Sequence, residues 1–434
     1  HASCAFNTLG YKKSAILTVE GVGEYQTTAL FVGDKKEIKP LKEVNFPHSL
    51  GLFYSTITSF LGFRVNNDEY KVMGLAAYGE PSMVNKLKKT IEIKEDGSFK
   101  LDLSYFSFRE SFKMFSPKMV ELLGKERKYG EKITKRDKDL AASLQAVTEE
   151  AYFKILNHLY DLTGSKNVCI AGGVALNSLA NGKIYRGTPF RKVHIFGPAG
   201  DGGSSMGAAL FLYRNILGKK LPKVKTLYLG TEYPNDEIKK ALDNSSAEYN
   251  RYESEEKLLG ETVKLLEKGK KVGWFYGRME FGPRALGARS ILARPWPKGM
   301  KDEVNKIKKR EKFRPFAASV LQGRVHEFFK TPEKKHNSPY MNFVFKVKKG
   351  KGSKVAAVTH EDRTCRIQTV GKENGRYYRL IKKFYDKTGV PLVLNTSFNV
   401  DGEPIVDTPQ QAVNDLLKTE IDHLVIGDFI VAKT

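Results

Sequence analysis

The chain has 434 residues but only three cysteines, Cys4, Cys169 and Cys365, which lie far apart and form no CxxC pair. An odd count at this spacing argues against a disulfide framework, so we expect a cytoplasmic protein with reduced thiols. The sequence also lacks an apolar run of the roughly 20 residues that a bilayer-spanning helix needs. We therefore expect no membrane partner.

Acidic residues are scarce relative to basic ones, with 49 Asp and Glu against 73 Lys and Arg, which gives a formal charge of +24. The excess divides evenly between residues 1–225 and 226–434, which argues against a detachable nucleic-acid-binding arm. A lysine-rich solvated surface explains much of this charge. The remainder favours anionic partners, either phosphorylated small molecules or nucleic acid.

Several common catalytic motifs are also missing. The chain has no Ser/His/Asp signature, no nucleophile elbow, no HExxH motif and no Cys/His spacing typical of zinc. Six histidines are expected to be structural or to lie on the surface: His48, His158, His194, His326, His336 and His423.

What the chain does contain is an alternation of short apolar strands and amphipathic helices. The predicted strands of the first half are 14–19, 27–32, 167–171 and 192–196, and its clearest predicted helices are 139–162 and 204–217. After the polar, lysine-rich segment 218–235, the pattern restarts with a helix near 255–268, strands at 271–275 and 391–394, a capping box at Thr408 and a hairpin at 423–432. Segment 92–136 has no clear pattern. The alternation predicts an α/β fold with parallel strands in two domains, 1–225 and 226–434.

Two glycine-rich loops follow predicted strands and open toward helices. The first contains Gly172 and Gly173, and the second is segment 197–203, which includes Asp201 and Gly202. Glycine lets the backbone approach a phosphate closely, and a helix N-terminus offers N–H groups to the anion. Neither loop is a Walker motif or a GxGxxG fingerprint, so a tight turn without a ligand is an equal alternative.

His1, Glu20 and Asp201 are potential metal ligands. One imidazole and two carboxylates suit a divalent transition ion such as iron, manganese or zinc. The sequence leaves open whether the three meet. On the residues alone, the simpler interpretation is that no metal binds. The three residues would then be a terminal histidine, a glutamate in a turn and an aspartate in a loop.

Arginines embedded among glycine, proline and phenylalanine form a third candidate site. Arg278, Arg284 and Arg289 lie in one glycine-rich segment, and Arg310 and Arg314 lie in another. Guanidinium groups bind phosphate bidentately, and a partly buried one needs partners. The pattern favours a phosphate-rich ligand over a merely solvated basic face.

Six segments are distinctive: HASCAF (1–6), EYKVMGLA (69–76), GGVALN (172–177), GRMEFGPRALG (277–287), RPFA (314–317) and NTSFN (395–399). Together they resemble the O-carbamoyltransferases of the nodulation-protein-U and antibiotic-tailoring (cephamycin and tobramycin) type, over nearly the whole chain. The resemblance implies an actin-like (ribonuclease-H-like) carbamoyl-transfer domain at 1–225, which would lack about a hundred N-terminal residues of the family. It implies a YrdC-like α/β domain at 226–434. That domain would make carbamoyl adenylate from ATP and carbamoyl phosphate.

The resemblance also assigns roles residue by residue. A divalent metal, iron first and magnesium or manganese as alternatives, would be held by His1, Glu20 and Asp201. The residues of adenylate formation would be Arg278, Arg284, Lys308, Arg310, His360 and Arg366. The nucleotide would contact Lys71, Gly172, Gly173, Asn177, Gly202, Arg314, Asn395 and Ser397.

Three positions depart from the family's pattern. Glu20 stands in place of an Asp that binds the metal, and its side chain is one methylene longer. Arg294 stands where the family usually has Asp, and Arg363 where it usually has Gly. We expect these changes to alter the metal site and the activation site.

The sequence therefore predicts an ATP-dependent O-carbamoyltransferase that acts on a hydroxyl of a sugar, an antibiotic or an oligosaccharide, with a homodimer as a compatible assembly. One alternative is a threonylcarbamoyl-type tRNA-modification enzyme or an RNA-binding factor, although the chain has no RNP-type aromatic motif and nucleic acid is not expected. The other is an actin-like sugar kinase, which leaves the second half unexplained.

Overall fold

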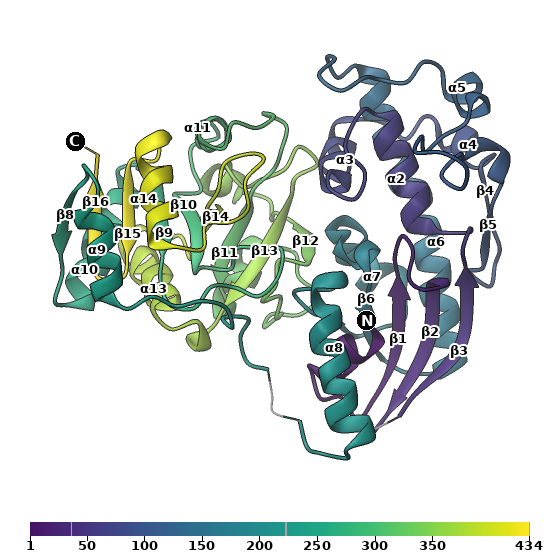
Figure 1. The fold of residues 1–434 in the computed structure, drawn as a ribbon, viewed down its shortest axis with the longest axis horizontal. Coiled ribbons are helices and arrows are strands. Elements are labelled where there is room, and N and C mark those ends of the chain that lie inside the picture. Colours follow the sequence, from purple (N-terminus) through teal and green to yellow (C-terminus); the bar gives the residue numbers. More distant parts are fainter. Residues whose placement is uncertain (36, 222–223, 434) are drawn as a thin grey trace. The chain divides into compact units, whose positions relative to one another are not determined.

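The structure is a computed structural model that describes residues 1–35, 37–221 and 224–433. The chain forms two compact units, His1–Val224 and Lys225–Thr434, and Figure 1 shows their elements in sequence colours. Residues 222–223 of the predicted linker lie outside the described residues. In the described ranges, no helix combines the length and the apolar character needed to cross a membrane.

The first unit is built on a five-stranded mixed sheet in the order β3-β2-β1-β6-β7. Its strands are β1 (Lys13–Val19), β2 (Gln26–Asp34), β3 (Glu37–Asn45), β6 (Asn167–Ala171) and β7 (Lys192–Ile195). The first three strands form an antiparallel meander, whereas β1, β6 and β7 run parallel. The carboxyl ends of the parallel strands therefore meet at one edge of the sheet, where ligands of α/β proteins commonly bind.

The 29-residue helix α6 (Lys135–Thr163) is the main helical element of this unit, and it contacts β1. It begins with a capping box between Thr134 and Asp137 and ends at Gly164, which adopts φ +58°. The other helices are α1 (Ala2–Asn7), α2 (Leu50–Phe60), α3 (Glu69–Leu75), α4 (Val84–Leu87), α5 (Pro117–Leu123), α7 (Ser178–Gly187) and α8 (Ser204–Phe211). A two-stranded sheet pairs β4 (Ile91–Ile93) with β5 (Phe99–Leu101).

The second unit is built on a nine-stranded mixed sheet in the order β12-β13-β11-β14-β10-β9-β15-β16-β8. The strands are β8 (Glu248–Arg251), β9 (Val272–Phe275), β10 (Arg289–Ala293), β11 (Ala317–Leu321), β12 (Phe343–Lys346), β13 (Thr364–Val370), β14 (Leu392–Ser397), β15 (His423–Ile426) and β16 (Phe429–Ala432). The pairs β11–β13 and β9–β15 are parallel, and the other pairs along this order are antiparallel.

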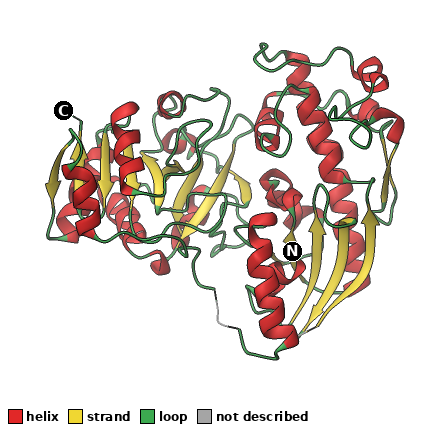
Figure 2. Ribbon diagram, viewed as in Figure 1, coloured by secondary structure: helices red, strands yellow, loops and turns green. Residues whose placement is uncertain are grey.

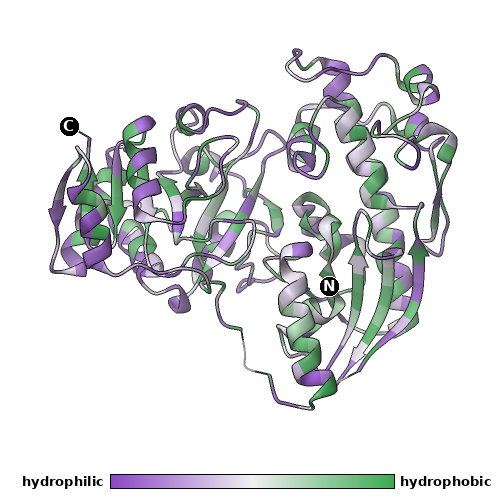
Figure 3. Ribbon diagram, in the orientation of Figure 1, coloured by the Kyte–Doolittle hydropathy of each residue, from purple (hydrophilic) through white to green (hydrophobic). Residues whose placement is uncertain are grey.

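The helices of the second unit are α9 (Asn235–Asp243), α10 (Glu255–Glu267), α11 (Met300–Ile307), α12 (Val325–Phe328), α13 (Arg376–Thr388) and α14 (Pro409–Lys418), drawn in red in Figure 2. α10 contacts α13, and α9 contacts α14. Each unit has its own apolar core. One includes Phe6, Ile16 and Cys169, and the other includes Phe275 and Leu424. Figure 3 shows this apolar character along the strands and on the sheet-facing parts of the helices.

The locally determined predictions are confirmed. Strand 167–171, the hairpin 423–432, the core position of Cys169 and the capping box of Thr408 with Gln411 are all present. The prediction of parallel strands is right for β1, β6 and β7 but wrong for most of the second sheet. Strand direction follows from tertiary pairing, which a local pattern does not encode. The helix predicted at 204–217 is also interrupted, since α8 ends at Phe211 and a π-helical turn, Leu212–Ile216, follows.

Candidate functional site

His1, Glu20 and Asp201 converge at the edge of the first sheet where β1, β6 and β7 end. Nε2 of His1 lies 2.9 Å from Oε2 of Glu20 and 3.4 Å from Oδ1 of Asp201. Ligand atoms from the three residues all lie within 4.8 Å of one another. The structure therefore brings together the residues that the sequence analysis considered as metal ligands, and we refer to them as the metal-ligand trio.

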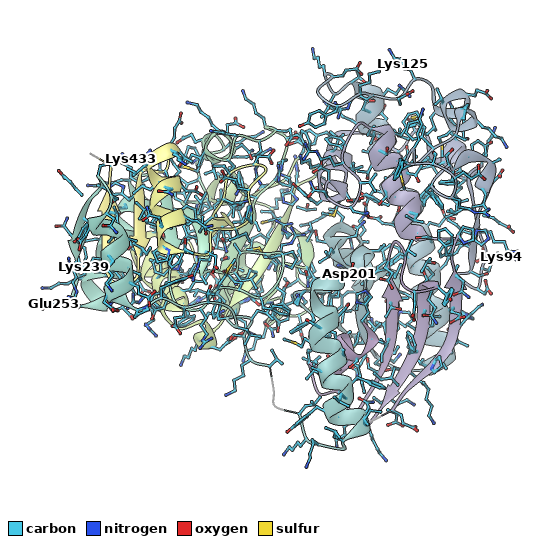
Figure 4. All side chains as sticks on the ribbon, viewed as in Figure 1. Lys94, Lys125, Asp201, Lys239, Glu253 and Lys433 are labelled. Carbon is cyan, nitrogen blue, oxygen red and sulfur yellow. The ribbon has the colours of Figure 1, made fainter. Side chains whose placement is uncertain are left out.

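Three separate segments position this trio. His1 is the N-cap residue of α1, and α1 is tied to α8 by a 2.7 Å hydrogen bond from Ser3 Oγ to the carbonyl oxygen of Gly207. Glu20 follows β1, and its N–H donates to the carbonyl oxygen of Thr27 at 2.9 Å. Asp201, labelled in Figure 4, begins the turn that leads into α8, and its side chain is 97% exposed.

The electrostatics of the trio suit a cation. The hydrogen bond with Glu20 raises the pKa of His1, because two carboxylates surround its ring. Oγ of Ser204 lies 3.3 Å from Nδ1, the other ring nitrogen of His1. One imidazole nitrogen and two carboxylate oxygens, one of them on an exposed side chain, fit a divalent transition ion that keeps open coordination positions.

The two glycine loops lie against each other beside this trio. The N–H of Gly172 donates to the carbonyl oxygen of Ala199 at 2.7 Å, and a Cβ placed on Gly200 would lie 3.8 Å from Cα of Gly173. Gly172 adopts φ +93°, and a side chain there would come within 2.2 Å of a carbonyl oxygen of β1. This position is therefore restricted to glycine for packing reasons.

Gly173 and Gly202 differ from Gly172 in that they border open space. A Cβ on Gly173 would meet nothing within 4 Å, and one on Gly202 would meet only Pro198, at 4.0 Å. Their backbone is therefore accessible to a ligand. A phosphate at this edge would meet backbone N–H groups near the start of α8.

Lys71 and Asn177, both predicted nucleotide contacts, have structural partners. Lys71 is buried in α3, and Nζ lies 3.2 Å from Oδ1 of Asp68. Oδ1 of Asn177 caps α7 by accepting the N–H of Ala180 at 3.1 Å, and its amide also exchanges hydrogen bonds with Gln145. These contacts account for both residues without a ligand, so their nucleotide role stays a prediction.

In the second unit, adjacent strands bring several predicted residues into one row. Arg366 on β13 pairs in register with Ala317 on β11, and Ala317 pairs with Asn395 on β14. Next to this row, the guanidinium of Arg310 lies 4.3 Å from the ring centroid of Phe316. These contacts place Arg366, Asn395 and Arg310 around the start of β11.

His360 joins the same region. One ring nitrogen, Nε2, lies 3.3 Å from the carbonyl oxygen of Phe316, and the other lies 3.2 Å from Oγ1 of Thr364. Burial, together with the nearby charge of Arg366, lowers the pKa of His360 to about 4. His360 is therefore a neutral imidazole at neutral pH.

Arg284, Arg310, Arg314 and Arg366, which we call the arginine cluster, act on one another electrostatically. Burial lowers the pKa of Arg366 well below its usual value, and the other three positive charges lower it further. Among the described residues, the buried Nε of Arg366 has no hydrogen-bond partner. Arg314 already pairs with Glu311 and Asp401. Partly buried positive charges that lie close together are stabilised further by an anion, and guanidinium groups are well suited to phosphate.

Lys308, Ser397 and Asn395 shape the loops around this cluster. Nζ of the buried Lys308 donates to the carbonyl oxygens of Ser397 at 2.6 Å and Asn399 at 2.8 Å, and burial lowers its pKa well below the usual value. Nδ2 of Asn395 donates to the carbonyl oxygen of Ala285 at 3.2 Å, beside Arg284. Their contacts in this structure are with the protein itself.

Arg278 lies on the surface of the second unit, and its role in adenylate formation stays a prediction. Its side chain is 57% exposed, and Nε lies 3.5 Å from Oε2 of Glu232. Together with residues 230–234 it lines a hollow of about 630 Å³.

Glu280, which was not considered for the site, and Arg289, which was considered only as one arginine of its segment, are structurally important residues. Oε1 of the buried Glu280 accepts the N–H groups of Leu286, Ala288 and Arg289. The guanidinium of Arg289 lies 3.6 Å from the ring centroid of Phe275 and donates to the carbonyl oxygen of Gly277 at 3.0 Å. These two residues fix both ends of the loop that carries Arg284. The sequence signal that could have identified Glu280 is its position as an acidic residue within an arginine-rich segment.

Two of the departures from the family's pattern have local explanations. Arg363 adopts φ +61°, the left-handed conformation that glycine tolerates best, which explains why glycine suits this position. Arg294 donates to the carbonyl oxygen of Glu267 at 2.9 Å, and its guanidinium lies 6.0 Å from the ring centroid of Trp296. Arg294 therefore links the end of β10 to α10.

Comparison with protein families matches residues 1–210 to the carbamoyltransferase N-terminus and residues 263–433 to the carbamoyltransferase C-terminus. An uncharacterised protein of Synechocystis sp. is 41% identical over 100% of this chain and 75% of its own length. Nodulation protein NolO of Bradyrhizobium diazoefficiens is 37% identical over 100% of this chain and 78% of its own. Nodulation protein NolNO of Sinorhizobium fredii is 39% identical over 100% of this chain and 63% of its own length. A crystal structure of full-length HypF in the phosphate- and nucleotide-bound form is a distant match, with a TM-score of 0.30 and 18% identity over 43% of this chain and 22% of that chain.

Proposed function

The chain belongs to the carbamoyltransferase family, and from this membership we propose that it is an ATP-dependent O-carbamoyltransferase. The second unit would form carbamoyl adenylate, and the first would transfer the carbamoyl group to a hydroxyl. The observation that carries this proposal is the arginine cluster, with its mutually repelling charges and the unpartnered Nε of Arg366 among the described residues. Such a site favours ligands with several phosphate oxygens.

The proposed reaction has two stages. Water first releases phosphate from carbamoyl phosphate and leaves carbamate, whose oxygen attacks the α-phosphorus of ATP and displaces pyrophosphate. The acceptor hydroxyl then attacks the carbamoyl carbon of the adenylate, loses its proton and displaces AMP. The arginine cluster would bind the phosphates and stabilise the charge that develops on the leaving group.

We further propose that the metal-ligand trio holds a divalent ion, with iron as the first candidate. When bound, such an ion supplies electrostatic stabilisation of the negative charge on the leaving phosphate. The donor set of the trio and its position next to the open glycines Gly173 and Gly202 support this. The strand order of the first sheet, a meander followed by two parallel strands, supports an actin-like first domain, and we propose a YrdC-like second domain on family grounds.

Pyrophosphate release tests the proposed function directly. The purified chain is incubated with ATP and carbamoyl phosphate, and pyrophosphate and AMP are measured with and without sugar acceptors. We expect pyrophosphate from the wild type and from Arg324→Ala, a control that removes an exposed arginine paired with Glu327. Arg366→Met should release none. ADP as the product, or no pyrophosphate from the wild type, would contradict the proposal.

A further inference from the structure

The first residues of the second unit pair with the segment that carries Arg278 and Arg284. The N–H of Met279 donates to the carbonyl oxygen of Thr231 at 2.8 Å. Tyr228 lies opposite Glu280 in an antiparallel bridge. This start of the second unit lies between the two regions that match the carbamoyltransferase family. The pairing therefore ties a segment outside both matches to the arginine-rich segment.

Tyr228 and Glu280 hold the two backbone groups of one residue, Leu286. The hydroxyl of Tyr228 donates to the carbonyl oxygen of Leu286 at 2.9 Å, and Oε1 of Glu280 accepts the N–H of Leu286 at 2.7 Å. Leu286 is buried, so loss of either bond leaves a backbone group without water to replace the partner. Leu286 follows Arg284 by two residues, and its position therefore fixes the path of the chain away from Arg284.

The side chain of Asn374 holds the hydroxyl of Tyr228 in place. Nδ2 of Asn374 donates to this hydroxyl at 3.1 Å, and Oδ1 of Asn374 accepts the N–H of Gly371 at 3.0 Å. Burial raises the pKa of Tyr228 above its usual value, so the hydroxyl keeps its proton at neutral pH. The hydroxyl therefore accepts from Asn374 and has its proton directed at Leu286.

The carbonyl oxygen of Leu286 also receives a bond from β13. Nε2 of Gln368 donates to it at 2.8 Å, and Gln368 follows Arg366 by two residues on this strand. A carbonyl oxygen has two lone pairs, and here one serves Tyr228 and the other serves Gln368. This carbonyl group therefore connects the loop of Arg284 to the strand of Arg366.

We propose that Tyr228 is a positioning residue for adenylate formation, because its hydroxyl fixes the loop that holds Arg284 within the arginine cluster. Charged groups stabilise a transition state best when they are already in place and need not move during the reaction. Tyr228 acts through Leu286 and Arg284 rather than on the reacting atoms. This assignment rests on the proposed function, since it assumes that the arginine cluster binds the phosphates of the activation step.

Tyr228→Phe tests the assignment, because it removes the hydroxyl and leaves the ring. Pyrophosphate release from ATP and carbamoyl phosphate is measured with radiolabelled ATP, so that low rates can be measured. We expect kcat/KM to fall about tenfold. Tyr249→Phe is the matched control, because it removes a tyrosine hydroxyl that donates to Asp243 from the edge strand β8. The control should keep the wild-type rate, and equal losses in the two variants would overturn the assignment.

A double variant distinguishes positioning from a general loss of stability. In the Arg284→Ala background, Tyr228→Phe should cause no further fall in kcat/KM, because the residue that it positions is gone. A further tenfold fall in that background would overturn the assignment. Asn374→Asp tests the same bond from the other side. It keeps an oxygen for the N–H of Gly371, but its carboxylate competes with Leu286 for the proton of Tyr228, so kcat/KM should fall as in Tyr228→Phe.

Binding of inorganic pyrophosphate, measured by calorimetry, separates this proposal from the proposed function because it needs no turnover. We expect Tyr228→Phe to weaken this binding about fivefold and Tyr249→Phe to leave it unchanged. Weaker binding in Tyr228→Phe, with no pyrophosphate release from the wild type, would reject the proposed function and support the positioning role. Wild-type binding and release in Tyr228→Phe would do the reverse. Neither binding nor release by the wild type would overturn both.

Discussion

Oε1 of Glu280 accepts the backbone N–H of Leu286 at 2.7 Å and so closes the loop that carries Arg284 into a ring. The same oxygen accepts the N–H of Ala288, also at 2.7 Å. The other carboxylate oxygen, Oε2, is buried and has no hydrogen-bond partner within the described part of the chain. A single carboxylate thus holds the loop of Arg284 in shape.

Replacement of this carboxylate should weaken the loop. In Glu280→Gln the amide keeps one acceptor oxygen but loses the charge, so we expect the free energy of unfolding to fall by about 1–2 kcal/mol. The affinity for carbamoyl phosphate should fall with it, since Arg284 loses its fixed position. Urea unfolding and calorimetry measure the two effects. Glu253→Gln, an exposed carboxylate labelled in Figure 4, is the control and should change neither.

Arg284 and Arg278 should differ, although they lie in the same motif. Arg284 belongs to the arginine cluster that shifts the pKa of Arg366, whereas Arg278 is exposed beside Glu232. We expect Arg284→Ala to reduce pyrophosphate release at least a hundredfold and Arg278→Ala to reduce it less than tenfold. Equal losses would show that Arg278 moves into the activation site during the reaction.

Stability should decrease in mild acid because of His194. Burial lowers the pKa of His194 to about 4, against 6.5 in the unfolded chain. Between these two values the unfolded state binds a proton that the folded state excludes, so the free energy of unfolding falls as the pH drops through this window. One pKa unit corresponds to about 1.4 kcal/mol, which limits this contribution to about 3 kcal/mol. His194→Gln should make the decrease between pH 6.5 and 4 smaller, with His158→Gln as the control. Some decrease should remain, because burial also lowers the pKa of His336 and His360 to about 4.

Arg363 offers a stabilising substitution. Its φ of +61° is unfavourable for a residue with a side chain, and the residue is exposed. We expect Arg363→Gly to raise the free energy of unfolding by about 0.5–1 kcal/mol, because relief of the strained backbone exceeds the added flexibility of the unfolded chain. Thermal unfolding at fixed pH checks this. Arg324→Gly, at a position with negative φ, should destabilise the chain instead.

The metal-ligand trio makes a prediction about metal content. Asp201→Asn keeps the shape of the side chain but removes a charge, and we expect it to lower the affinity for Fe(II) and Mn(II) about tenfold or more. His1→Ala should have a similar effect. Metal analysis after dialysis gives the readout, with Asp243→Asn, an exposed aspartate of the second unit, as the control. If the metal content of Asp201→Asn is unchanged, the hypothesis that the trio binds a metal is wrong.

The parts of the structure that the sequence predicted well depend on neighbouring residues. Strand 167–171 and the cap of Thr408 follow from a buried apolar run and from a side chain that bonds its own helix. The antiparallel pairs of the second sheet were missed because strand pairing joins distant segments. The role of Glu280 was missed for a related reason, since its partners are backbone N–H groups that become neighbours only after the loop folds.

The candidate sites were predictable to different degrees. Arg284 and Arg310 were selected because arginine among glycine and aromatic residues is unusual on a solvated surface, whereas the role of Arg366 came from the resemblance to a family. His1, Glu20 and Asp201 gave no signal through spacing, and their selection rested on the resemblance to a family. Arg278 shows the limit of a motif, because neighbours in a sequence can point to different surroundings.

The meeting of His1 with Asp201 also has an entropic consequence. A cation shared by these two side chains would act as a cross-link between segments about 200 residues apart, and closing so long a loop removes more freedom from the unfolded chain than closing a short one. The first unit would then melt at a temperature set by the free metal concentration. Heat resistance of that unit would be an indicator of metal loading that needs neither substrate nor turnover.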